Sequence, residues 1–424
     1  MTETEQAARP SSFWKSFGPG LVWAATSIGV SHLVQSTRAG AQAGFALVGV
    51  IVLALVLKYP FFEYGARYAA ATQNSLVEGY RRIGRWALWL YLAITVVSAM
   101  IALAAVLMFT SYLTGYAFDA SWPVAITGVV LLIVCMAILY IGKYPGLDLS
   151  IKIILLFLLI STLAAVAIAL PRMDVSTVTL WPGDLIGTVV PFAFLLALIG
   201  WMPSPVDVAV WSSLWTLEKD KVTGGRTSVR NATRDFAIGY VGTGFLAVGF
   251  VALGAAVLYG SDVELSASGA VFSTQLVDLY SQTLGGWSRP FVLIAAVTTM
   301  FSTTLAVLDG YPRAIERTLM TLRTKGDVEV LPRSERLYWG IALVIGTVAI
   351  TVLLLFVGNL TTMVDFATTV AFLTAPLLGY LNLKAVTSKD VPAEYQPARW
   401  MIGLSWIGLV LLGGTGVAYL VSLL

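Results

Sequence analysis

Apolar stretches long enough to cross a lipid bilayer follow one another along almost the whole chain of 424 residues. A bilayer requires about 20 consecutive apolar residues from each crossing helix, and this length divides the sequence into about eleven spans. Their approximate limits are 17–44, 46–72, 86–115, 122–142, 148–171, 185–215, 235–261, 287–311, 338–357, 359–384 and 398–423. Only 12% of the residues are charged, against about 25% in soluble proteins. The sequence therefore predicts an all-α polytopic membrane protein.

Composition also excludes several classes of function. The net charge of +3 is small, and no basic run with interleaved aromatic residues suggests nucleic acid as a partner. The single cysteine, Cys135, allows neither an intramolecular disulfide nor a cysteine-based metal site. There is no Walker-type loop, and the single histidine rules out a His-Glu metalloprotease motif. We expect no enzyme and no cofactor. The expected partners are the lipid bilayer and a small-molecule or ion substrate, and the oligomeric state stays open.

The basic residues fall mainly in one set of loops, which predicts that this set is cytoplasmic. The set comprises Arg81, Arg82, Arg85, Lys143, Lys219, Lys221, Arg226, Arg230, Arg234, Arg313, Arg317, Arg323, Lys325, Arg333, Arg336, Lys384 and Lys389. The opposite set holds little beyond Arg172 and Arg289. The N-terminus is then cytoplasmic, and an odd number of spans places Leu424 outside. The short N-terminal tail lacks the order of a signal peptide, and a prokaryotic inner membrane is the favoured location.

Two of the predicted spans are interrupted near their middle. The first span is broken at Gly29-Val30-Ser31-His32, and the sixth at Gly200-Trp201-Met202-Pro203-Ser204-Pro205. A bilayer tolerates unwound backbone only where protein buries it or where it lines a polar cavity. Paired breaks in corresponding helices of two repeats indicate the substrate site of a secondary transporter.

The breaks and the orientation divide the chain into two inverted five-helix repeats. Because span one enters from inside and span six from outside, the spans that follow them form repeats of opposite orientation. The predicted units are a tail (1–16), a first repeat (17–171), a second repeat (172–384), and a linker with peripheral helix 11 (385–424).

The first break contains the only histidine of the chain, His32. A neutral imidazole binds metals and suits proton coupling, because its pKa lies near neutrality. The alternative is a buried histidine bonded to carbonyl groups that the break releases. Ser31 and Gln35 offer neutral oxygen ligands from the same stretch, or cap the broken helix ends. Gly29, which has no side chain, is also assigned to the predicted substrate site.

The second break offers Met202, whose thioether is a soft ligand for transition metals or a flexible core filler. Ser204 and the carbonyl groups freed near the prolines are further substrate ligands. Asp207 lies about one turn beyond Met202. Its carboxylate could attract a cation, carry a proton, or pair with Arg38 of span one.

Other charges within the spans favour structural pairs. Glu63 and Arg67 have the i, i+4 spacing of an intrahelical ion pair. Lys58, one turn before Glu63, extends this charged strip, and Arg38 is an alternative partner for Glu63. Asp309 is expected to pair with Arg313 near the inner end of span eight, as a gate or, less favoured, as a proton relay.

Span ten is rich in threonine, which either lines a transport route or holds helices together. These residues are Thr361, Thr362, Thr368, Thr369 and Thr374. Thr374 is the one assigned to the predicted substrate site.

These features resemble the NRAMP family of proton-coupled divalent metal transporters, which have the LeuT-type inverted-repeat fold. The resemblance covers almost the whole membrane region. Its clearest marks are Gly18-Pro19-Gly20 before the first break, Ala39-Gly40-Ala41 after it, and Met202-Pro203 in the second break. Between the first two marks the spacing matches the family pattern without a gap.

The departures from the family pattern fall on its metal ligands. Gly29 stands where the family has its metal-binding aspartate, and His32 stands where it has asparagine. Val30 and Ser31 replace the Pro-Gly between them, and Ser204 replaces the histidine of Met-Pro-His. Met202 alone matches a family side-chain ligand.

Three hypotheses follow. The first is a divalent metal transporter (Mn²⁺-like) with a site rebuilt from His32, Met202, Asp207 and backbone carbonyl groups. The second is a transporter of a non-metal small solute, amino-acid-like or an organic cation, with a wider cavity lined by Trp23, Trp201 and Trp211. The third is a non-transporting receptor or partner protein, which predicts no cavity at the breaks. The first two imply secondary transport by alternating access.

Overall fold

The computed structural model describes residues 17–120, 122–169, 171, 178–261, 263–324 and 334–424. The N-terminal tail and the basic loop residues Arg172, Lys325 and Arg333 lie outside this set. Within it the chain is almost wholly helical, which confirms the predicted class. Eight helices among the described residues are long and apolar enough to cross a membrane.

The longer helices give the architecture. In chain order they are α2 (Pro19–Ser27), α3 (Thr37–Ala43), α4 (Val48–Thr72), α5 (Leu76–Ile83), α6 (Arg85–Ala117), α7 (Val124–Ala169), α8 (Phe192–Gly200), α9 (Ala209–Thr223), α10 (Val229–Leu258), α11 (Gly269–Leu284), α12 (Arg289–Arg323), α13 (Glu335–Leu355), α14 (Leu360–Val386) and α15 (Arg399–Ser422). Short helical turns complete them: η1 (Ser31–Ser36), η4 (Gly183–Leu185), η5 (Val206–Val208), η6 (Gly286–Ser288) and η7 (Ala393–Tyr395).

Most predicted spans correspond to one helix each, with three differences. The first and sixth spans are divided, into α2, η1 and α3 and into α8, η5 and α9. The single helix α7 covers the range predicted as two spans, and its first part, Val124–Ile141, is apolar enough to cross alone.

Two helices, α5 and α11, lie where only loops were predicted. Both are too short to cross a bilayer. At α5, Ser75 and Glu78 form a reciprocal capping box that satisfies the first backbone amides. The strongly amphipathic sequence of α5 fits a helix that lies at the end of the bundle.

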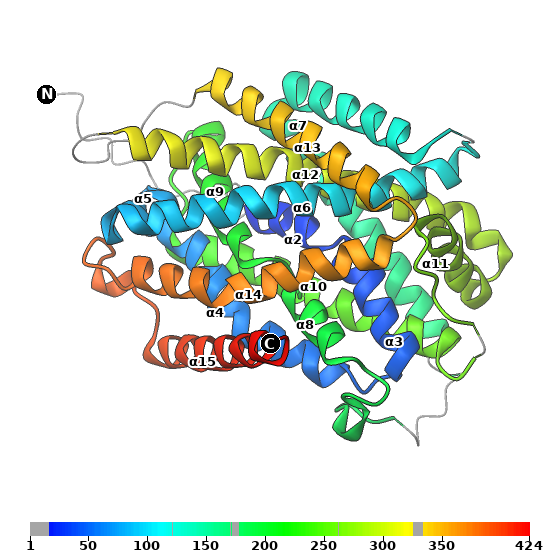
Figure 1. The fold of residues 1–424 in the computed structure, drawn as a ribbon. Helices are drawn as coiled ribbons and strands as arrows, with labels where there is room; N and C mark the ends of the chain where they lie inside the picture. Colours follow the sequence, from blue (N-terminus) through cyan, green and yellow to red (C-terminus); the bar gives the residue numbers. More distant parts are fainter. Residues whose placement is uncertain (1–16, 121, 170, 172–177, 262, 325–333) are drawn as a thin grey trace, which may run out of the picture.

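The broken first span lies inside the bundle, surrounded by longer helices (Figure 1). α10 packs along both of its halves, α2 and α3. Glycines permit this close approach. A Cβ on Gly40 would lie 2.1 Å from the carbonyl oxygen of Val251, and one on Gly254 would lie 2.3 Å from that of Thr37.

The broken sixth span has its own pair of supporting helices. α4 packs on its second half, α9, and α14 packs on its first half, α8. The first span is thus held by one unbroken helix, α10, and the sixth by two, α4 and α14. The two breaks meet in the interior.

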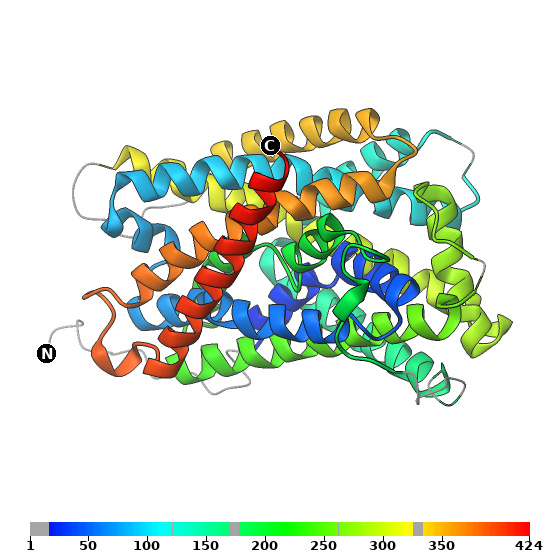
Figure 2. The same cartoon turned by 60° about the horizontal axis from the view of Figure 1, so that its bottom comes forward.

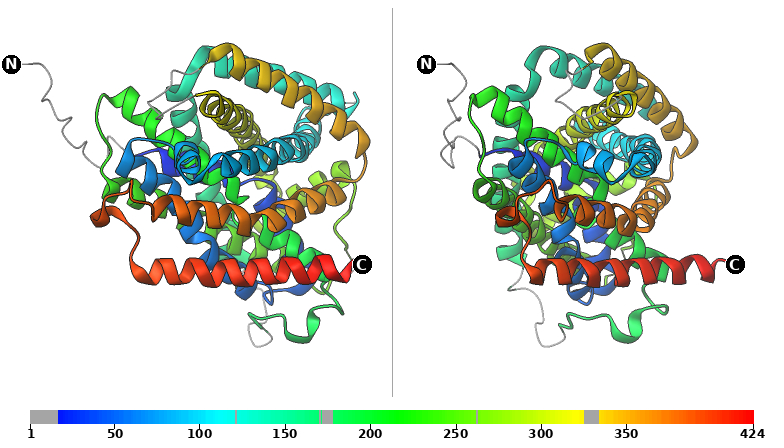
Figure 3. Two further views of the ribbon diagram at one scale, coloured as in Figure 1. Left: turned by 60° about the vertical axis from the view of Figure 1, so that its left-hand side comes forward. Right: turned by 90° about the vertical axis from the view of Figure 1, so that its left-hand side faces the viewer.

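α15 lies at the edge of the bundle. It crosses the outside of the molecule in Figure 2 and runs as a separate straight helix in Figure 3. Its inner side packs on α14 and α4. Its outer side exposes large apolar residues such as Trp406, Val410 and Val417, as expected of a helix that faces lipid.

Candidate functional site

The first break begins where α2 ends. The backbone turns to an extended conformation at Ile28, passes Gly29, and continues into the π-helical turn η1. Because regular bonding stops here, the carbonyl groups of Ala25 and Ile28 need other donors. The hydroxyl of Thr303, on α12, lies 3.2 and 3.0 Å from these two oxygens and 3.0 Å from the carbonyl oxygen of Thr299, so the three share its one proton.

The second break lies between α8, which ends at Gly200, and η5. The break contains Pro203 and Pro205, the two prolines of the predicted interruption. Its limits agree with the predicted ones. Here the released carbonyl groups are bound by the ammonium of Lys58, from α4. Lys58 Nζ lies 3.1 Å from the carbonyl oxygen of Ile199, 2.9 Å from that of Gly200 and 2.9 Å from that of Ser204.

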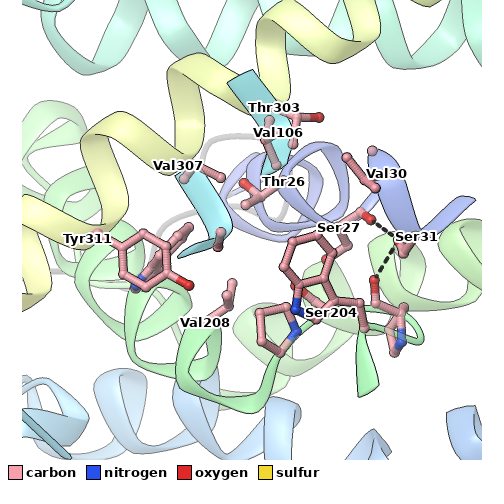
Figure 4. Close-up of a pocket in the computed structure, with 16 residues that line it drawn as sticks. Thr26, Ser27, Val30, Ser31, Val106, Ser204, Val208, Thr303, Val307 and Tyr311 are labelled. Carbon is pink, nitrogen blue, oxygen red and sulfur yellow. Dashed lines mark hydrogen bonds between the residues drawn. The ribbon is translucent and has the colours of Figure 1, made fainter. Parts of the chain in front are cut away.

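A small cavity lies where the two breaks meet (Figure 4). Its volume is about 30 Å³, which is room for one or two water molecules. Hydroxyl groups come from both breaks and from α12, whereas Val106, Val208 and Val307 supply apolar walls. Among the predicted tryptophans, Trp201 and Trp211 line it. Trp23 does not line it, but packs among Phe62, Phe236 and Tyr240.

Three of the residues predicted at the site, Gly29, Ser31 and Ser204, line this cavity. The hydroxyl of Ser31 donates to the carbonyl oxygen of Ser27 at 2.9 Å and to that of Pro203 at 3.4 Å (Figure 4). Ser31 therefore connects the two breaks directly.

His32 and Gln35 point elsewhere. The imidazole of His32 is fully buried between the hydroxyl of Ser31, 2.7 Å from Nδ1, and the carbonyl oxygen of Thr243, 3.0 Å from Nε2. Gln35 faces α14, where its amide donates to Asp365 at 2.9 Å. Neither side chain is among those that line the cavity.

Met202 and Thr374 also lie away from the cavity. Met202 is fully buried in an apolar cluster with Ala39, Ala43 and Val251. The hydroxyl of Thr374 donates to carbonyl oxygens of its own helix, at 3.1 and 3.2 Å. Both positions favour the packing alternatives.

Asp207 is buried, with 2% of its surface exposed, at the start of the helical segment that follows the second break. Among the described residues, neither carboxylate oxygen forms a hydrogen bond. Its electrostatic partners are the ammonium of Lys58 and the hydroxyl of Tyr311. Asp207 is thus a buried acid whose nearest donors, the Tyr311 hydroxyl and the amides of Asp207 and Val208, do not reach good hydrogen-bond geometry.

The proposed pairs of Arg38 with Asp207 and with Glu63 are wrong. Arg38 instead binds Asp365, on α14, through two contacts of 2.6 and 3.1 Å. It also donates to the amide oxygen of Gln35 at 2.8 Å. The reason is geometric, because Arg38 lies on α3, beyond the break and nearer the beginning of α14.

The other two predicted ion pairs are present. Arg67 contacts Glu63 at 2.6 Å, and Arg313 contacts Asp309 at 2.8 Å. Asp309 also accepts from Trp215 of α9, at 3.2 Å, and from Tyr338 of α13, at 2.9 Å. This second network joins α12, α9 and α13.

The predicted metal ligands do not converge. Within the described residues, no group of three or more His, Cys, Asp or Glu side chains could hold a metal ion. Thr303 also fills the space beside Gly29, since a Cβ at Gly29 would lie 2.9 Å from Thr303 Cγ2. An acidic side chain at this position would displace Thr303.

Sequence reasoning missed the roles of Lys58 and Thr303. A lysine in the middle of an apolar span was itself a signal, but its spacing to Glu63 suggested a shared strip. Thr303 belongs to Ser302-Thr303-Thr304, a short run of hydroxyl residues in the eighth span.

Solved structures of membrane transporters share the fold of this protein. A mutant of the Eremococcus coleocola manganese transporter superposes with a TM-score of 0.75 at 15% identity, over 99% of this chain and 90% of that one. Mhp1, a nucleobase-cation-symport-1 family transporter with bromovinylhydantoin bound, gives 0.59 at 14% identity, over 98% and 95%. MhsT in complex with L-phenylalanine gives 0.55 at 17% identity, over 95% and 98%. The fold is that of LeuT-type membrane transporters.

Sequence comparison narrows the class to a family. The family model described as natural resistance-associated macrophage protein-like, Nramp, matches residues 20–422. An uncharacterized protein of Pasteurella multocida (strain Pm70) is 32% identical over 420 residues, which cover 97% of this chain and 94% of that protein. The chain belongs to the Nramp family, as the resemblance in the sequence predicted.

Proposed function

We propose that this chain is a secondary transporter that works by alternating access around the two breaks, and that its substrate is a small non-metal solute. The observation that carries the proposal is the buried ammonium of Lys58 in the second break, bound to three carbonyl oxygens. A divalent cation at the breaks requires negative ligands, whereas Lys58 places a basic amine there, next to the carboxylate of Asp207.

The electrostatic penalty for a divalent ion supports this choice. Two unit charges about 4 Å apart repel by about 4 kcal/mol at an effective dielectric constant of about 20. A divalent ion at that distance from Lys58 would meet about twice this repulsion. The carbonyl groups of Ala25 and Ile28 at the first break are uncharged ligands, and they share the single hydroxyl proton of Thr303 with the carbonyl oxygen of Thr299.

An amino-acid-like solute suits the remaining groups. The second half of the first span begins at the cavity, so the positive end of its dipole can receive a carboxylate. Thr26 and Ser27 supply hydroxyl groups, and Trp201 and Val307 supply apolar surface. The similarity in fold to proteins solved with bromovinylhydantoin and L-phenylalanine supports an organic solute.

The cavity must widen to admit such a solute, and the charge networks on its two sides are the proposed gates. In the orientation predicted from the basic loops, Arg38 and Asp365 close the outer side. Asp309 and Arg313 close the cytoplasmic side. With both networks formed and a cavity of about 30 Å³, the described state corresponds to an occluded transporter. The inverted five-helix repeats stay part of this proposal.

Asp207 favours a second candidate, a divalent metal transporter. Its buried carboxylate has oxygens without hydrogen-bond partners in the described part of the chain, and the family is represented among solved structures by a manganese transporter. Rotation of Asp207 toward the cavity would give a cation one negative ligand.

Uptake into proteoliposomes tests the two candidates. Purified protein is assayed for Mn²⁺ entry with a trapped metal-quenched dye, and for entry of a panel of radiolabelled amino acids. We expect flat Mn²⁺ traces and saturable uptake of at least one amino acid. Empty liposomes serve as the negative control, and the Eremococcus coleocola transporter serves as the positive control for Mn²⁺.

The opposite result would overturn the proposal. Saturable Mn²⁺ entry that Asp207→Asn abolishes would establish the metal candidate. If neither Mn²⁺ nor any amino acid enters with well-folded protein, the amino-acid-like substrate is wrong.

A further inference from the structure

Lys58 is fully buried, with none of its surface exposed, although it lies in the middle of a membrane-spanning helix. A buried ammonium is costly unless its hydrogens are bonded. Here the carbonyl oxygens of Ile199, Gly200 and Ser204, which we call the carbonyl cage, accept them. The cage is formed by the last two residues of α8 and by Ser204 of the second break.

The position of Lys58 on α4 separates it from the other charges of that helix. Glu63 is five residues further on, which places it about 140° around the helix from Lys58. Glu63 is engaged by Arg67 through contacts of 2.6, 2.9 and 3.1 Å. Lys58 is therefore directed at the sixth span rather than at the ion pair on its own helix.

The surroundings of the ammonium would also suit a free monovalent cation. The ring of Phe62 presents its face at 5.6 Å, a favourable cation–π distance. Asp207 interacts electrostatically with Lys58, and among the described residues no donor bonds its carboxylate with good geometry. Carbonyl oxygens that replace a hydration shell are the usual ligands of monovalent ions in membrane proteins.

We propose that the amine of Lys58, tethered to α4, occupies a site at the second break that would otherwise bind a monovalent cation. It holds the released carbonyl groups of α8 and Ser204 in place and excludes free ions from them. Lys58 is thus a residue that determines specificity. This inference deepens the proposed function, because it removes the need for a co-bound sodium or potassium ion at the second break.

Two properties follow for the protein as it exists. Wild-type protein should be indifferent to Na⁺, K⁺ and NH₄⁺, since its site is filled. Lys58→Ala removes the ammonium but leaves the carbonyl cage and Asp207, so this variant should gain a site for a monovalent ion that wild type lacks.

Thermal unfolding in detergent tests the gain of a site. Wild type, Lys58→Ala and Lys58→Gln are compared in chloride salts of NH₄⁺, K⁺, Na⁺ and N-methyl-D-glucamine at equal ionic strength. Binding to the folded state raises the transition temperature saturably with ligand concentration. We expect Lys58→Ala to unfold at a lower temperature in N-methyl-D-glucamine and to regain several degrees in at least one of the small cations.

The other variants separate the charge from the hydrogen bonds. Gln at this position keeps amide donors for the carbonyl cage, so Lys58→Gln should show no saturable response. The matched surface control is Lys389→Ala, which removes an exposed lysine and should behave as wild type does. Lys58→Ser provides a second variant that opens the site if Lys58→Ala does not fold.

Either of two results would overturn the inference. One is a saturable response of wild type to a small cation. The other is the absence of any response in the folded Ala or Ser variant. Because unfolding is measured without transport, neither result depends on the solute. The proposed function could therefore fail in the uptake assay while this site is established, or the reverse.

Discussion

Gly29 and Thr303 together occupy the space in which the family places a carboxylate. Because the Cβ position of Gly29 lies 2.9 Å from Thr303 Cγ2, we expect Gly29→Asp to destabilise the protein by overpacking, by about 2 kcal/mol. Adding Thr303→Ala should remove most of this loss. Thermal unfolding of the single and double variants measures the effect.

The companion single variant, Thr303→Ala, controls for loss of the hydroxyl bonds to Ala25 and Ile28. If the double variant is no more stable than Gly29→Asp, steric conflict is not the reason that an acid is excluded. Titration calorimetry with Mn²⁺ on the double variant then asks whether a carboxylate alone restores metal binding. With Lys58 present, we expect no detectable heat.

At the level of elements, each broken span depends on close packing against an unbroken one. Gly40 of α3 lies against α10, where a Cβ would approach the carbonyl oxygen of Val251 to 2.1 Å. Gly40→Ala should force the helices apart and lower the free energy of unfolding by about 1–3 kcal/mol. Chemical or thermal unfolding in detergent provides the measurement.

Gly242, in α10 itself, is the matched control. A Cβ at this position meets no atom within 4 Å. Since alanine is favoured over glycine within a helix by about 0.5–1 kcal/mol, Gly242→Ala should be neutral or stabilising. Equal losses from both substitutions would mean that the contact between α3 and α10 is not what limits stability.

The hydrophobic pattern of the sequence predicts some helices of this fold and misses others. Long apolar runs such as α4, α6 and α10 were recognisable because a bilayer fixes their length. The short amphipathic helices α5 and α11 were missed, because their polar faces resemble loops. The side-chain partners of Arg38 could not be predicted, since they depend on how the segment beyond the first break meets the beginning of α14.

Across the whole molecule, the proposed outer gate controls access to the cavity. We expect Asp365→Asn to open it, because the substitution breaks the contact of Arg38 with Asp365. The loss of about 1 kcal/mol for a partly exposed pair corresponds to about a fivefold increase in the open population. A single cysteine at Val30, which lines the cavity, reports access through its labelling rate in a Cys135→Ser background.

Asp390→Asn in the same background is the control, since Asp390 pairs with Arg82 at 3.5 Å, away from the cavity. It should leave the labelling rate within about twofold of the parent, the scale expected of an exposed pair. An unchanged rate in Asp365→Asn would remove Arg38 and Asp365 from the gating proposal.

At this same scale the sequence located the site but not its chemistry. The breaks were recognisable from prolines, glycines and polar residues within apolar runs, and Gly29, Ser31 and Ser204 do line the cavity. His32 and Met202 were assigned as ligands because they lie in the breaks. The local turn of the backbone decides where each side chain points. His32 points to the carbonyl oxygen of Thr243, and Met202 points into an apolar cluster.

The way in which Lys58 and Thr303 fill the two breaks has an evolutionary consequence. An acid at position 29 would collide with Thr303, and a metal ion at the second break would meet Lys58. Each change toward a metal site is unfavourable unless the others have already occurred. A lineage with this arrangement would have to pass through several less stable intermediates to reach metal transport. The present site therefore makes a return to metal transport difficult.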